Sequence, residues 1–286
     1  MLKGAITAII TPFKGGKINY KKLEELIEFQ ISNGIDGIVV CGTTGESSTL
    51  SESEKKKLIK FTIDKVKRRI PVIAGTGSND TKKALSLSKH ACDCSADYLL
   101  LVSPYYNKCT QSGLINHYTY IADNVSKPSI LYNVPSRTGL NILPKTVSTL
   151  SQHPNIYGLK EASGNLPQAI EVISTCHENF SVFSGNDDII VPMLSIGCAG
   201  VISVLSNIFP KETHDICSYY FNGNLNYAKK LQLQLFPLIN ELFSEVNPIP
   251  VKEALNILGF DVGAPRMPLT TMTDNSRLQK LLNSFN

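Results

Sequence analysis

A lysine at the end of a short apolar run is the residue in this sequence most able to do covalent chemistry. Lys160 closes the run Ile-Tyr-Gly-Leu-Lys at 156–160. At the end of a buried strand its ammonium group would lose hydration, which favours the neutral amine. A neutral amine attacks ketones and forms imines. The alternative is an ordinary surface lysine or one paired with Glu161, and the residue type alone leaves that open.

A tyrosine and an arginine follow the preceding apolar run. They are Tyr132 and Arg137, in the segment Tyr-Asn-Val-Pro-Ser-Arg-Thr-Gly at 132–139. If the two runs are neighbouring strands, Tyr132 lies near the Lys160 amine. A phenol can carry protons to and from a carbinolamine, and a guanidinium can bind a carboxylate through two hydrogen bonds. Judged alone, the segment also fits a packed aromatic and a surface charge.

Two further polar segments follow apolar runs. Gly-Thr-Thr-Gly-Glu at 42–46 offers backbone amides and the hydroxyls of Thr43 and Thr44 to an anion, although a structural turn explains it equally well. It is not a P-loop, because it lacks the phosphate-binding lysine. In Ser-Pro-Tyr-Tyr-Asn at 103–107, Tyr105 and Tyr106 cannot face the same way. One of them can enter a site while the other packs against a neighbour or a second subunit.

Metal chemistry is not predicted. Asp187 and Asp188 are explained by the preference of helix N-termini for acidic residues, although they also suit a cation. The histidines have no metal-ligand spacing and are interpreted as surface or capping residues; they stand at 90, 117, 153, 177 and 214. The seven cysteines lack a C-x-x-C pair and are expected to be reduced thiols. We therefore expect neither a metal nor a cofactor.

These side chains need a scaffold that brings strand ends together. Eight short apolar runs alternate with amphipathic stretches, which indicates repeated βα units around a parallel sheet. Eight strands can close into a TIM (β/α)8 barrel, in which catalytic groups lie at the carboxyl ends of the strands. The expected strands are 5–10, 37–40, 72–74, 98–102, 129–132, 156–160, 181–183 and 200–203.

Helix signals support this repeat and extend beyond it. Asn33-Gly34 is suited to ending a helix, and Ser51 with Glu54 forms a capping-box pattern at the start of the next one. After the last strand only helical patterns follow, so a barrel is expected over 1–222 and a C-terminal helical domain over 223–286. The helices expected in this second part are 227–243, 250–258 and 276–285.

Bulk properties bound the class of protein. The 286 residues are 42% hydrophobic and 18% charged, which is typical of a folded soluble protein. The net charge of +4 is spread along the chain, so nucleic-acid binding is not expected. A small anionic substrate is the expected partner. No apolar stretch suits a signal peptide or a membrane span. A cytoplasmic location without membrane contact is expected.

Taken together, the four segments at 42–46, 103–107, 132–139 and 158–162 resemble the dihydrodipicolinate synthase family in order and spacing. The resemblance extends over essentially the whole chain. It implies a Schiff-base lyase that condenses pyruvate with aspartate 4-semialdehyde on the path to diaminopimelate and lysine. It also implies a homotetramer built from tight dimers.

The resemblance also implies roles for individual residues. Lys160 forms the imine with pyruvate, and Tyr132 moves protons to and from the intermediates. Thr43 links Tyr132 to Tyr106, which the adjoining subunit donates. Further expected substrate contacts are made by Thr44 to pyruvate, by Arg137 to the semialdehyde, and by Gly185 and the Ile202 carbonyl as secondary contacts.

Relatives in the same superfamily share the lysine and tyrosine but act on sugars, namely N-acetylneuraminate lyase and 2-keto-3-deoxy sugar-acid aldolases. Arg137 favours the synthase, because a small aldehyde that carries a carboxylate explains an arginine physically. A non-catalytic binding or structural barrel is the alternative of another class, since fold does not fix function.

The resemblance finally implies an effector pocket for lysine at the dimer interface, with Ser47, Asn79 and Tyr105 as candidate residues. Inhibited relatives carry histidine or acidic side chains in this pocket, whereas the matching positions here are Glu52, Lys55 and Lys83. Added positive charge would repel a cationic effector. We therefore expect weak or absent inhibition by lysine.

Overall fold

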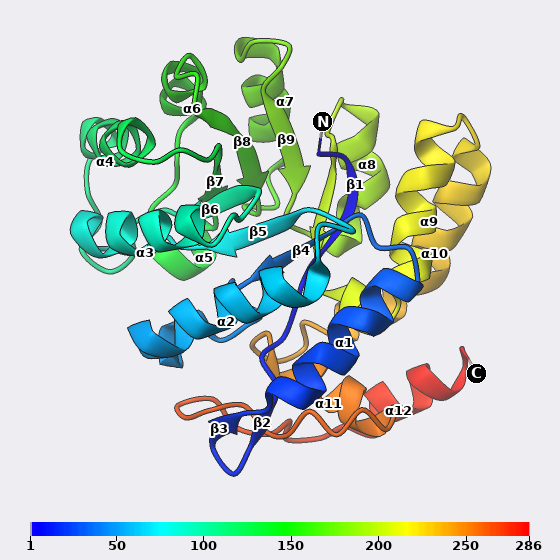
Figure 1. The fold of residues 1–286 in the computed structure, drawn as a ribbon. Coiled ribbons are helices and arrows are strands. Elements are labelled where there is room, and N and C mark those ends of the chain that lie inside the picture. Colours follow the sequence, from blue (N-terminus) through cyan, green and yellow to red (C-terminus); the bar gives the residue numbers. More distant parts are fainter. Residues whose placement is uncertain (1, 286) are drawn as a thin grey trace.

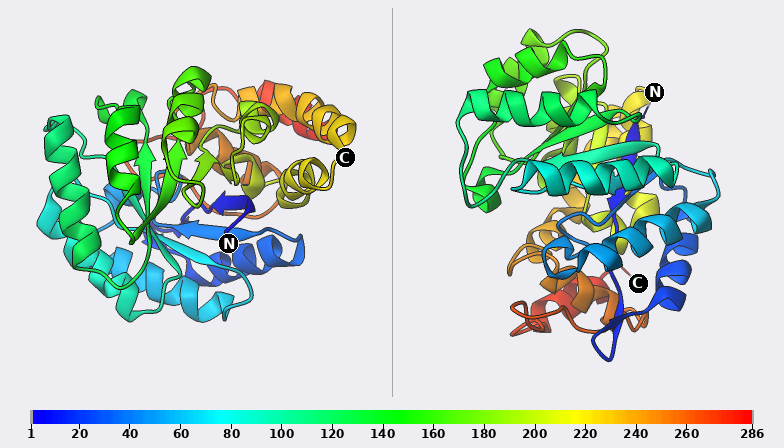
Figure 2. Two further views of the ribbon diagram at one scale, coloured as in Figure 1. Left: turned by 90° about the horizontal axis from the view of Figure 1, so that it is seen from above. Right: turned by 60° about the vertical axis from the view of Figure 1, so that its left-hand side comes forward.

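A closed barrel of eight parallel strands forms the centre of the protein, whose computed structural model describes residues 2–285. Each strand pairs with its neighbour in chain order, and β1 closes the ring by pairing with both β4 and β10. The view from above shows the ring (Figure 2). The predicted TIM barrel is confirmed. Its strands are β1 (Gly4–Ala8), β4 (Gly37–Val40), β5 (Val72–Gly75), β6 (Tyr98–Val102), β7 (Ser129–Asn133), β8 (Ile156–Glu161), β9 (Ser181–Ser184) and β10 (Gly200–Ser203).

Helices cover the outside of this barrel (Figure 1). They follow the strands in order as α1 (Tyr20–Ser32), α2 (Glu52–Val66), α3 (Thr81–Asp93), α4 (Gln111–Asp123), α6 (Pro144–Ser151), α7 (Leu166–Thr175), α8 (Ile190–Ser195) and α9 (Pro210–Phe221). The single turn α5 (Pro135–Thr138) instead follows β7 at the carboxyl end of the barrel. The loops contain further short elements. Strands β2 (Phe13–Lys14) and β3 (Lys17–Ile18) form a hairpin, and the 3-10 turns are η1 (Ser47–Thr49), η2 (Asp187–Ile189) and η3 (Leu205–Asn207).

The expected strands match the observed ones to within two residues at each end. The first differs most, because β1 ends at Ala8 and not at Ile10. The Ile10 amide donates to the side-chain carbonyl of Asn207 at 3.0 Å, so a side chain takes the place of a strand partner there. Alternating polarity could not reveal this, because Ile9 and Ile10 are buried like the strand itself.

The helix-terminal signals are confirmed. Ser51 Oγ accepts from the Glu54 amide at 3.2 Å and the Ser51 amide donates to Glu54 Oε2 at 2.9 Å, which is the capping box of α2. At the end of α1, Gly34 adopts the left-handed conformation with φ of 78°.

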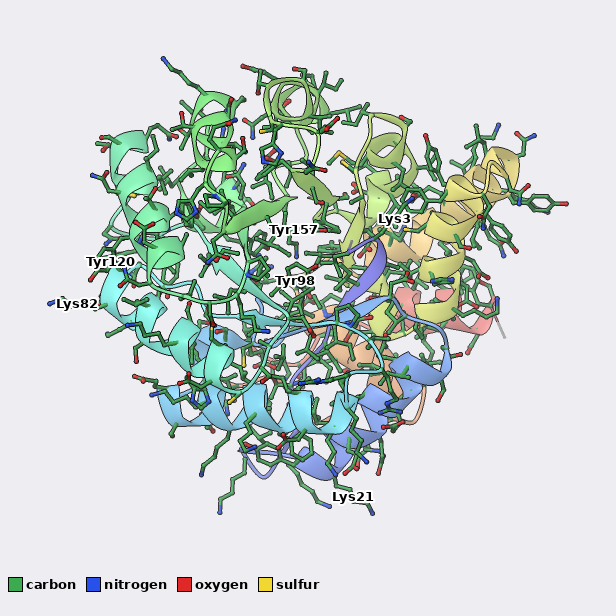
Figure 3. All side chains as sticks on the ribbon, turned by 45° about the horizontal axis from the view of Figure 1, so that its top comes forward. Lys3, Lys21, Lys82, Tyr98, Tyr120 and Tyr157 are labelled. Carbon is green, nitrogen blue, oxygen red and sulfur yellow. The ribbon has the colours of Figure 1, made fainter. Side chains whose placement is uncertain are left out.

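The amino-terminal end of the barrel is closed by aromatic side chains. The rings of Tyr98 and Tyr157 lie 4.9 Å apart, and the Tyr157 hydroxyl accepts a hydrogen bond from the Leu2 amide at 2.9 Å. Figure 3 shows both tyrosines near the barrel centre. Above them the interior is filled by side chains such as Ile6, Ile130 and Phe183. Any ligand of the barrel must therefore enter from the carboxyl end.

Three helices follow the barrel, as expected: α10 (Leu225–Glu241), α11 (Ile249–Ile257) and α12 (Ser276–Asn283). The expected boundary at 222 and 223 falls in the turn between α9 and α10. Leu238, Val251 and Leu278 from these helices share one hydrophobic core with barrel residues. In Figure 1, α11 and α12 lie near the β2–β3 hairpin, beyond the carboxyl ends of the strands. Among residues 2–285, no helix is long and apolar enough to cross a membrane.

Candidate active site

Two connected cavities open at the carboxyl end of the barrel. The inner cavity, of about 180 Å³, is lined by Lys160, Thr44 and Gly185 among others. The outer cavity, of about 300 Å³, is lined by Lys55, Ser47 and Tyr105 among others. Both walls include the same seven residues, which are Gly42, Thr43, Leu100, Tyr132, Val134, Arg137 and Asn247. The expected site residues of three separate loops thus meet at one place.

Lys160 and Tyr132 face each other across neighbouring strands. They are register partners in the β7–β8 pair, and Lys160 Nζ lies 4.5 Å from the centroid of the Tyr132 ring. Each side chain is only 6% exposed. Within residues 2–285, no carboxylate lies within 4.0 Å of this amine. The amine is therefore held in a buried place without the partner that a structural lysine would need.

Glu161 does not pair with Lys160, because successive side chains on a strand point to opposite faces. Its carboxylate points outward and accepts hydrogen bonds from the Ser163 amide at 2.7 Å and Gln168 Nε2 at 3.0 Å. Asn133, the next residue after Tyr132, also donates to it at 3.0 Å. The ordinary alternative for Lys160, an ion pair with its neighbour, is thereby excluded.

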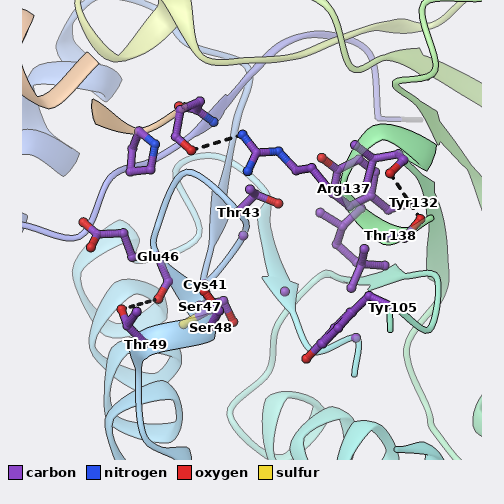
Figure 4. Close-up of a pocket in the computed structure, with 18 of the residues that line it drawn as sticks. Cys41, Thr43, Glu46, Ser47, Ser48, Thr49, Tyr105, Tyr132, Arg137 and Thr138 are labelled. Atoms are coloured by element: carbon purple, nitrogen blue, oxygen red, sulfur yellow. Dashed lines mark hydrogen bonds between the residues drawn. The ribbon is translucent and has the colours of Figure 1, made fainter. Parts of the chain in front are cut away.

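Arg137 reaches the cavities from α5, the short helix that follows β7. One of its terminal nitrogens donates to the Asn247 carbonyl at 3.1 Å, which fixes the direction of the side chain. Figure 4 shows it extending toward Thr43. The guanidinium has five N–H donors, so it retains capacity for a carboxylate. Its positive charge makes the region attractive to small anions.

The Gly42–Glu46 turn brings two threonines to the inner cavity. The Thr44 hydroxyl is buried and accepts from Asn247 Nδ2 at 3.0 Å, and the Thr43 carbonyl accepts from the Glu46 amide at 3.0 Å. Glu46 ends the turn in the left-handed conformation with φ of 56°. Within residues 2–285 no hydrogen bond joins the hydroxyls of Thr43 and Tyr132. Such contacts often close only when a ligand is bound.

The two secondary contacts differ in position. Gly185 lines the inner cavity, and a Cβ atom there would lie 3.0 Å from Lys160 Cε and 2.4 Å from Ala162 Cβ. A side chain at this position would therefore displace the lysine. Ile202 is fully buried in β10 and is not part of the cavity lining, which Val204 reaches instead.

Tyr105 and Tyr106 separate as expected for adjacent residues. Tyr105 lines the outer cavity, whereas Tyr106 is 90% exposed and lines neither cavity of its own chain. Tyr106 has a φ of 72°, which is rare for a residue with a side chain. The loop therefore directs this phenol away from the site that its own chain forms.

The candidate effector residues are only partly brought together. Ser47, Tyr105 and Lys55 line the outer cavity. Asn79 does not line it, and its carbonyl accepts from Asn107 Nδ2 at 2.9 Å. Burial lowers the pKa of Lys55. Glu52 lies on the exposed surface and pairs with Lys56, and Lys83 is also exposed.

Asp187 and Asp188 lie in the first turn of η2, as expected for acidic residues at a helix N-terminus. The Asp187 side chain is nevertheless buried, and its Oδ2 accepts from the amides of Val204 and Leu205, each at 2.9 Å. Burial raises the pKa of Asp187. His117 is not a surface residue but is buried in α4. The contacts of Asp187 and the burial of His117 could not be predicted from the sequence, because both depend on the element packed opposite. Residues 2–285 contain no cluster of three potential metal ligands.

Asn247 is the cavity residue that the sequence did not reveal. It precedes α11 in the C-terminal part and contacts both Thr44 and Arg137. Its Oδ1 atom is buried and has no hydrogen-bond partner among the described residues. It follows no barrel strand, and an asparagine before proline suggests only a helix start. No local signal could have placed it in the site.

Known proteins with similar sequences identify the family of this chain. The family model described as the dihydrodipicolinate synthetase family matches residues 1–283. The 4-hydroxy-tetrahydrodipicolinate synthase of Clostridium novyi (strain NT) is 51% identical over 288 residues, covering 100% of this chain and 97% of the relative. That of Clostridium tetani (strain Massachusetts / E88) is 56% identical over 282 residues, covering 98% and 96%.

Solved structures give the same result. The crystal structure of dihydrodipicolinate synthase from Thermotoga maritima superposes with a TM-score of 0.97 at 42% sequence identity, covering 99% of this chain and 98% of that chain. Sequence and structure thus match over their full lengths, and the chain belongs to the dihydrodipicolinate synthetase family.

Proposed function

We propose that this chain condenses pyruvate with L-aspartate 4-semialdehyde to 4-hydroxy-tetrahydrodipicolinate through an imine on Lys160, in diaminopimelate and lysine biosynthesis. The observation that carries the mechanism is the buried Lys160 amine, which lies over the Tyr132 ring and has no carboxylate within 4.0 Å in residues 2–285. The names of the full-length relatives support the same reaction.

In the first half of this reaction, Lys160 Nζ attacks the keto carbon of pyruvate. The carbinolamine loses water and becomes an imine. Tyr132 is the proton carrier, because its phenol is beside the amine and is covered from bulk water. The Thr44 hydroxyl and the amides of Thr43 and Thr44 hold the pyruvate carboxylate, while the Thr43 hydroxyl links Tyr132 to Tyr106 of the adjoining subunit. Gly185 leaves the space that the lysine needs.

In the second half, loss of a proton from the methyl group of the imine gives an enamine, whose terminal carbon attacks the aldehyde. Arg137 binds the carboxylate of the semialdehyde through its remaining N–H donors. The amino group of the condensed product then attacks the imine carbon, which closes the ring and releases Lys160. The backbone carbonyl of Ile202 in β10 is a secondary contact in this proposal, and the Ile202 side chain lies outside the cavity lining.

The test of this proposal is intact mass after incubation with pyruvate and borohydride, with Lys160→Ala beside the wild type. We expect a pyruvate-sized adduct on the wild type alone, and turnover of aspartate 4-semialdehyde. An adduct without that turnover would favour a sugar-acid aldolase. Absence of any adduct would support a non-catalytic barrel.

We also infer that Tyr106 completes the site of an adjoining subunit in a homotetramer of tight dimers. Its exposure and its absence from both cavities of its own chain support this. Tyr106→Phe and Lys160→Ala chains can be mixed and allowed to exchange subunits. Donation across the interface predicts that activity rises above that of either parent, because one site of each hybrid is intact. No rise despite proven exchange would place Tyr106 elsewhere.

We infer further that lysine inhibits this enzyme weakly or not at all. The Lys55 ammonium lines the outer cavity that contains Ser47 and Tyr105, and it opposes a cationic ligand. An inhibition curve measures this directly, and saturation below the millimolar range would contradict it. Lys55→Glu is the matched variant, for which we expect stronger inhibition.

A further inference from the structure

A buried lysine of the C-terminal helices contacts the turn that carries the two threonines. Lys252 lies in α11 and is 1% exposed. Its Nζ donates to Glu46 Oε1 at 2.7 Å, to the Thr11 carbonyl at 3.1 Å and to the Ala264 carbonyl at 3.3 Å. An ammonium group has three donors, so all of them are used. The charge also lies 4.3 Å from the centroid of the Phe13 ring.

The other member of the pair, Glu46, is equally constrained. Its second carboxylate oxygen accepts from the Arg266 amide at 2.8 Å. Its backbone is in the left-handed region, which is unfavourable for a residue with a side chain and persists only where the surroundings enforce it. The preceding Gly45 carbonyl is also held, by the Thr11 hydroxyl at 2.7 Å. The end of the Gly42–Glu46 turn is therefore anchored to the C-terminal part of the chain.

A residue just before the same helix contacts the middle of the turn. Asn247, just before α11, donates to the Thr44 hydroxyl, while Lys252 binds Glu46. Residues in and just before α11 thus hold the turn at two points, on either side of Gly45. Without these contacts, a turn rich in glycine would have several backbone conformations to choose from.

A buried ion pair is an inefficient way to stabilise a fold, because losing hydration offsets much of the attraction. Hydrophobic residues of the same volume often give equal or greater stability. The Lys252–Glu46 pair instead fixes the geometry of the backbone at Glu46, which is in the left-handed conformation. The residue that needs this geometry is Thr44, two positions before Glu46 in the inner cavity.

We propose that Lys252, through Glu46, is a positioning residue that holds the Gly42–Glu46 turn in the shape that receives the carboxylate of the 2-oxo acid substrate. The C-terminal helices then help to shape the active site and are not only an addition to the barrel. This inference rests on the proposed function, in which Thr43 and Thr44 bind pyruvate.

The experiment compares three proteins in steady-state kinetics and thermal unfolding: the wild type, Lys252→Met and the double variant Lys252→Met/Glu46→Gln. In Lys252→Met the Glu46 charge is buried without its partner, so the melting temperature falls and the KM for pyruvate rises about 10- to 100-fold. The KM for the semialdehyde stays within about twofold, because Arg137 is bound by Asn247 and not by the ion pair.

The double variant separates geometry from stability. It contains neither buried charge, so its melting temperature returns toward that of the wild type, while the KM for pyruvate remains raised. Recovery of both quantities would overturn the proposal and leave the pair with a structural role only. If Lys252→Met does not fold, the double variant alone gives the answer.

Glu241→Gln is the matched control. Glu241 is a buried carboxylate of α10 that pairs with Arg277 at 3.1 Å and contacts no cavity. Its substitution lowers the melting temperature and leaves the KM for pyruvate unchanged. An equal rise in that KM would show that any loss of stability produces it and would overturn the proposal. Failure of the proposed function is recognised separately, as a wild type that forms no borohydride-trapped adduct.

Discussion

The two faces of the β7–β8 strand pair use polar residues in opposite ways. Tyr132 and Lys160 point into the barrel, and their next neighbours Asn133 and Glu161 point out of it. All four are at least nine-tenths buried. On the outer face every carboxylate and amide group has partners, whereas on the inner face the amine and the phenol have no hydrogen bond within residues 2–285.

On each strand, adjacent residues therefore have different roles. The outward residue supports the stability of the fold, and the inward residue is available for function. Buried polar groups without partners are unfavourable, and those that line a cavity are available to a ligand. The outer network of Asn133, Asn141, Glu161, Ser163 and Gln168 fixes the register of the two strands. Tyr132 and Lys160 are held in place by the strands that this network fixes. Their own hydrogen-bonding groups remain free for substrate.

The largest effect is expected from Lys160→Ala. Without the amine no imine forms, so we expect kcat to fall at least about 10⁴-fold. Stability should be unchanged or higher, because a buried polar group without a hydrogen-bond partner is removed. Urea unfolding together with the steady-state assay measures both. A loss of several kcal/mol in the free energy of unfolding would mean that the inner face also supports the fold.

The opposite pattern is expected from Glu161→Ala on the outer face. Removal of the carboxylate leaves the Asn133 and Gln168 amides and the Ser163 N–H with fewer acceptors in a buried region. We expect the free energy of unfolding to fall by about 4 kcal/mol. The kcat per folded molecule should change only a few-fold. A stable variant that has lost its activity would contradict the separation of the two faces.

Tyr132→Phe tests the inner face without changing its shape. The ring remains beside Lys160 and only the proton carrier is lost, so we expect kcat to fall about 10²-fold or more. The free energy of unfolding should stay within about 0.5 kcal/mol, because the hydroxyl has no hydrogen bond to lose within residues 2–285. Borohydride trapping should still give the adduct, but more slowly. An unchanged kcat would exclude Tyr132 as the proton carrier.

The contrast between the faces also explains what the sequence could predict. Strands such as 98–102 are apolar throughout, so their place in a barrel and the residues at their carboxyl ends could be inferred. The sequence could not show whether Lys160 pairs with Glu161, because the partners of Glu161 include Asn133 and Gln168 from other elements.

The least predictable part of the site comes from the C-terminal helices. Asn247 and Lys252 lie about 200 residues from the turn that they contact, and nothing near them in the sequence marks them. A buried lysine in a helix has the same local pattern as an exposed one. Long-range contacts of this kind follow from packing, for which periodicity contains no information.

The smallest effect at neutral pH is expected in the outer helical layer, at His117. Its Nδ1 lies 2.8 Å from Thr81 Oγ1 in α3, and its Nε2 is buried without a partner among the described residues. Burial lowers the pKa of His117 to about 4, whereas an unfolded histidine titrates near its ordinary value of about 6.5. Between these values the unfolded chain binds more protons, so the free energy of unfolding falls as pH falls.

This contribution is complete above pH 6.5 and is lost as the pH approaches 4, and the part lost between pH 7.5 and pH 5 is about 2 kcal/mol. Urea unfolding of the wild type and of His117→Gln at pH 7.5 and pH 5 measures it. The glutamine variant removes the titrating group, so its stability should decline less on acidification by that amount. An identical decline in both proteins would mean that the folded protein protonates His117 without penalty.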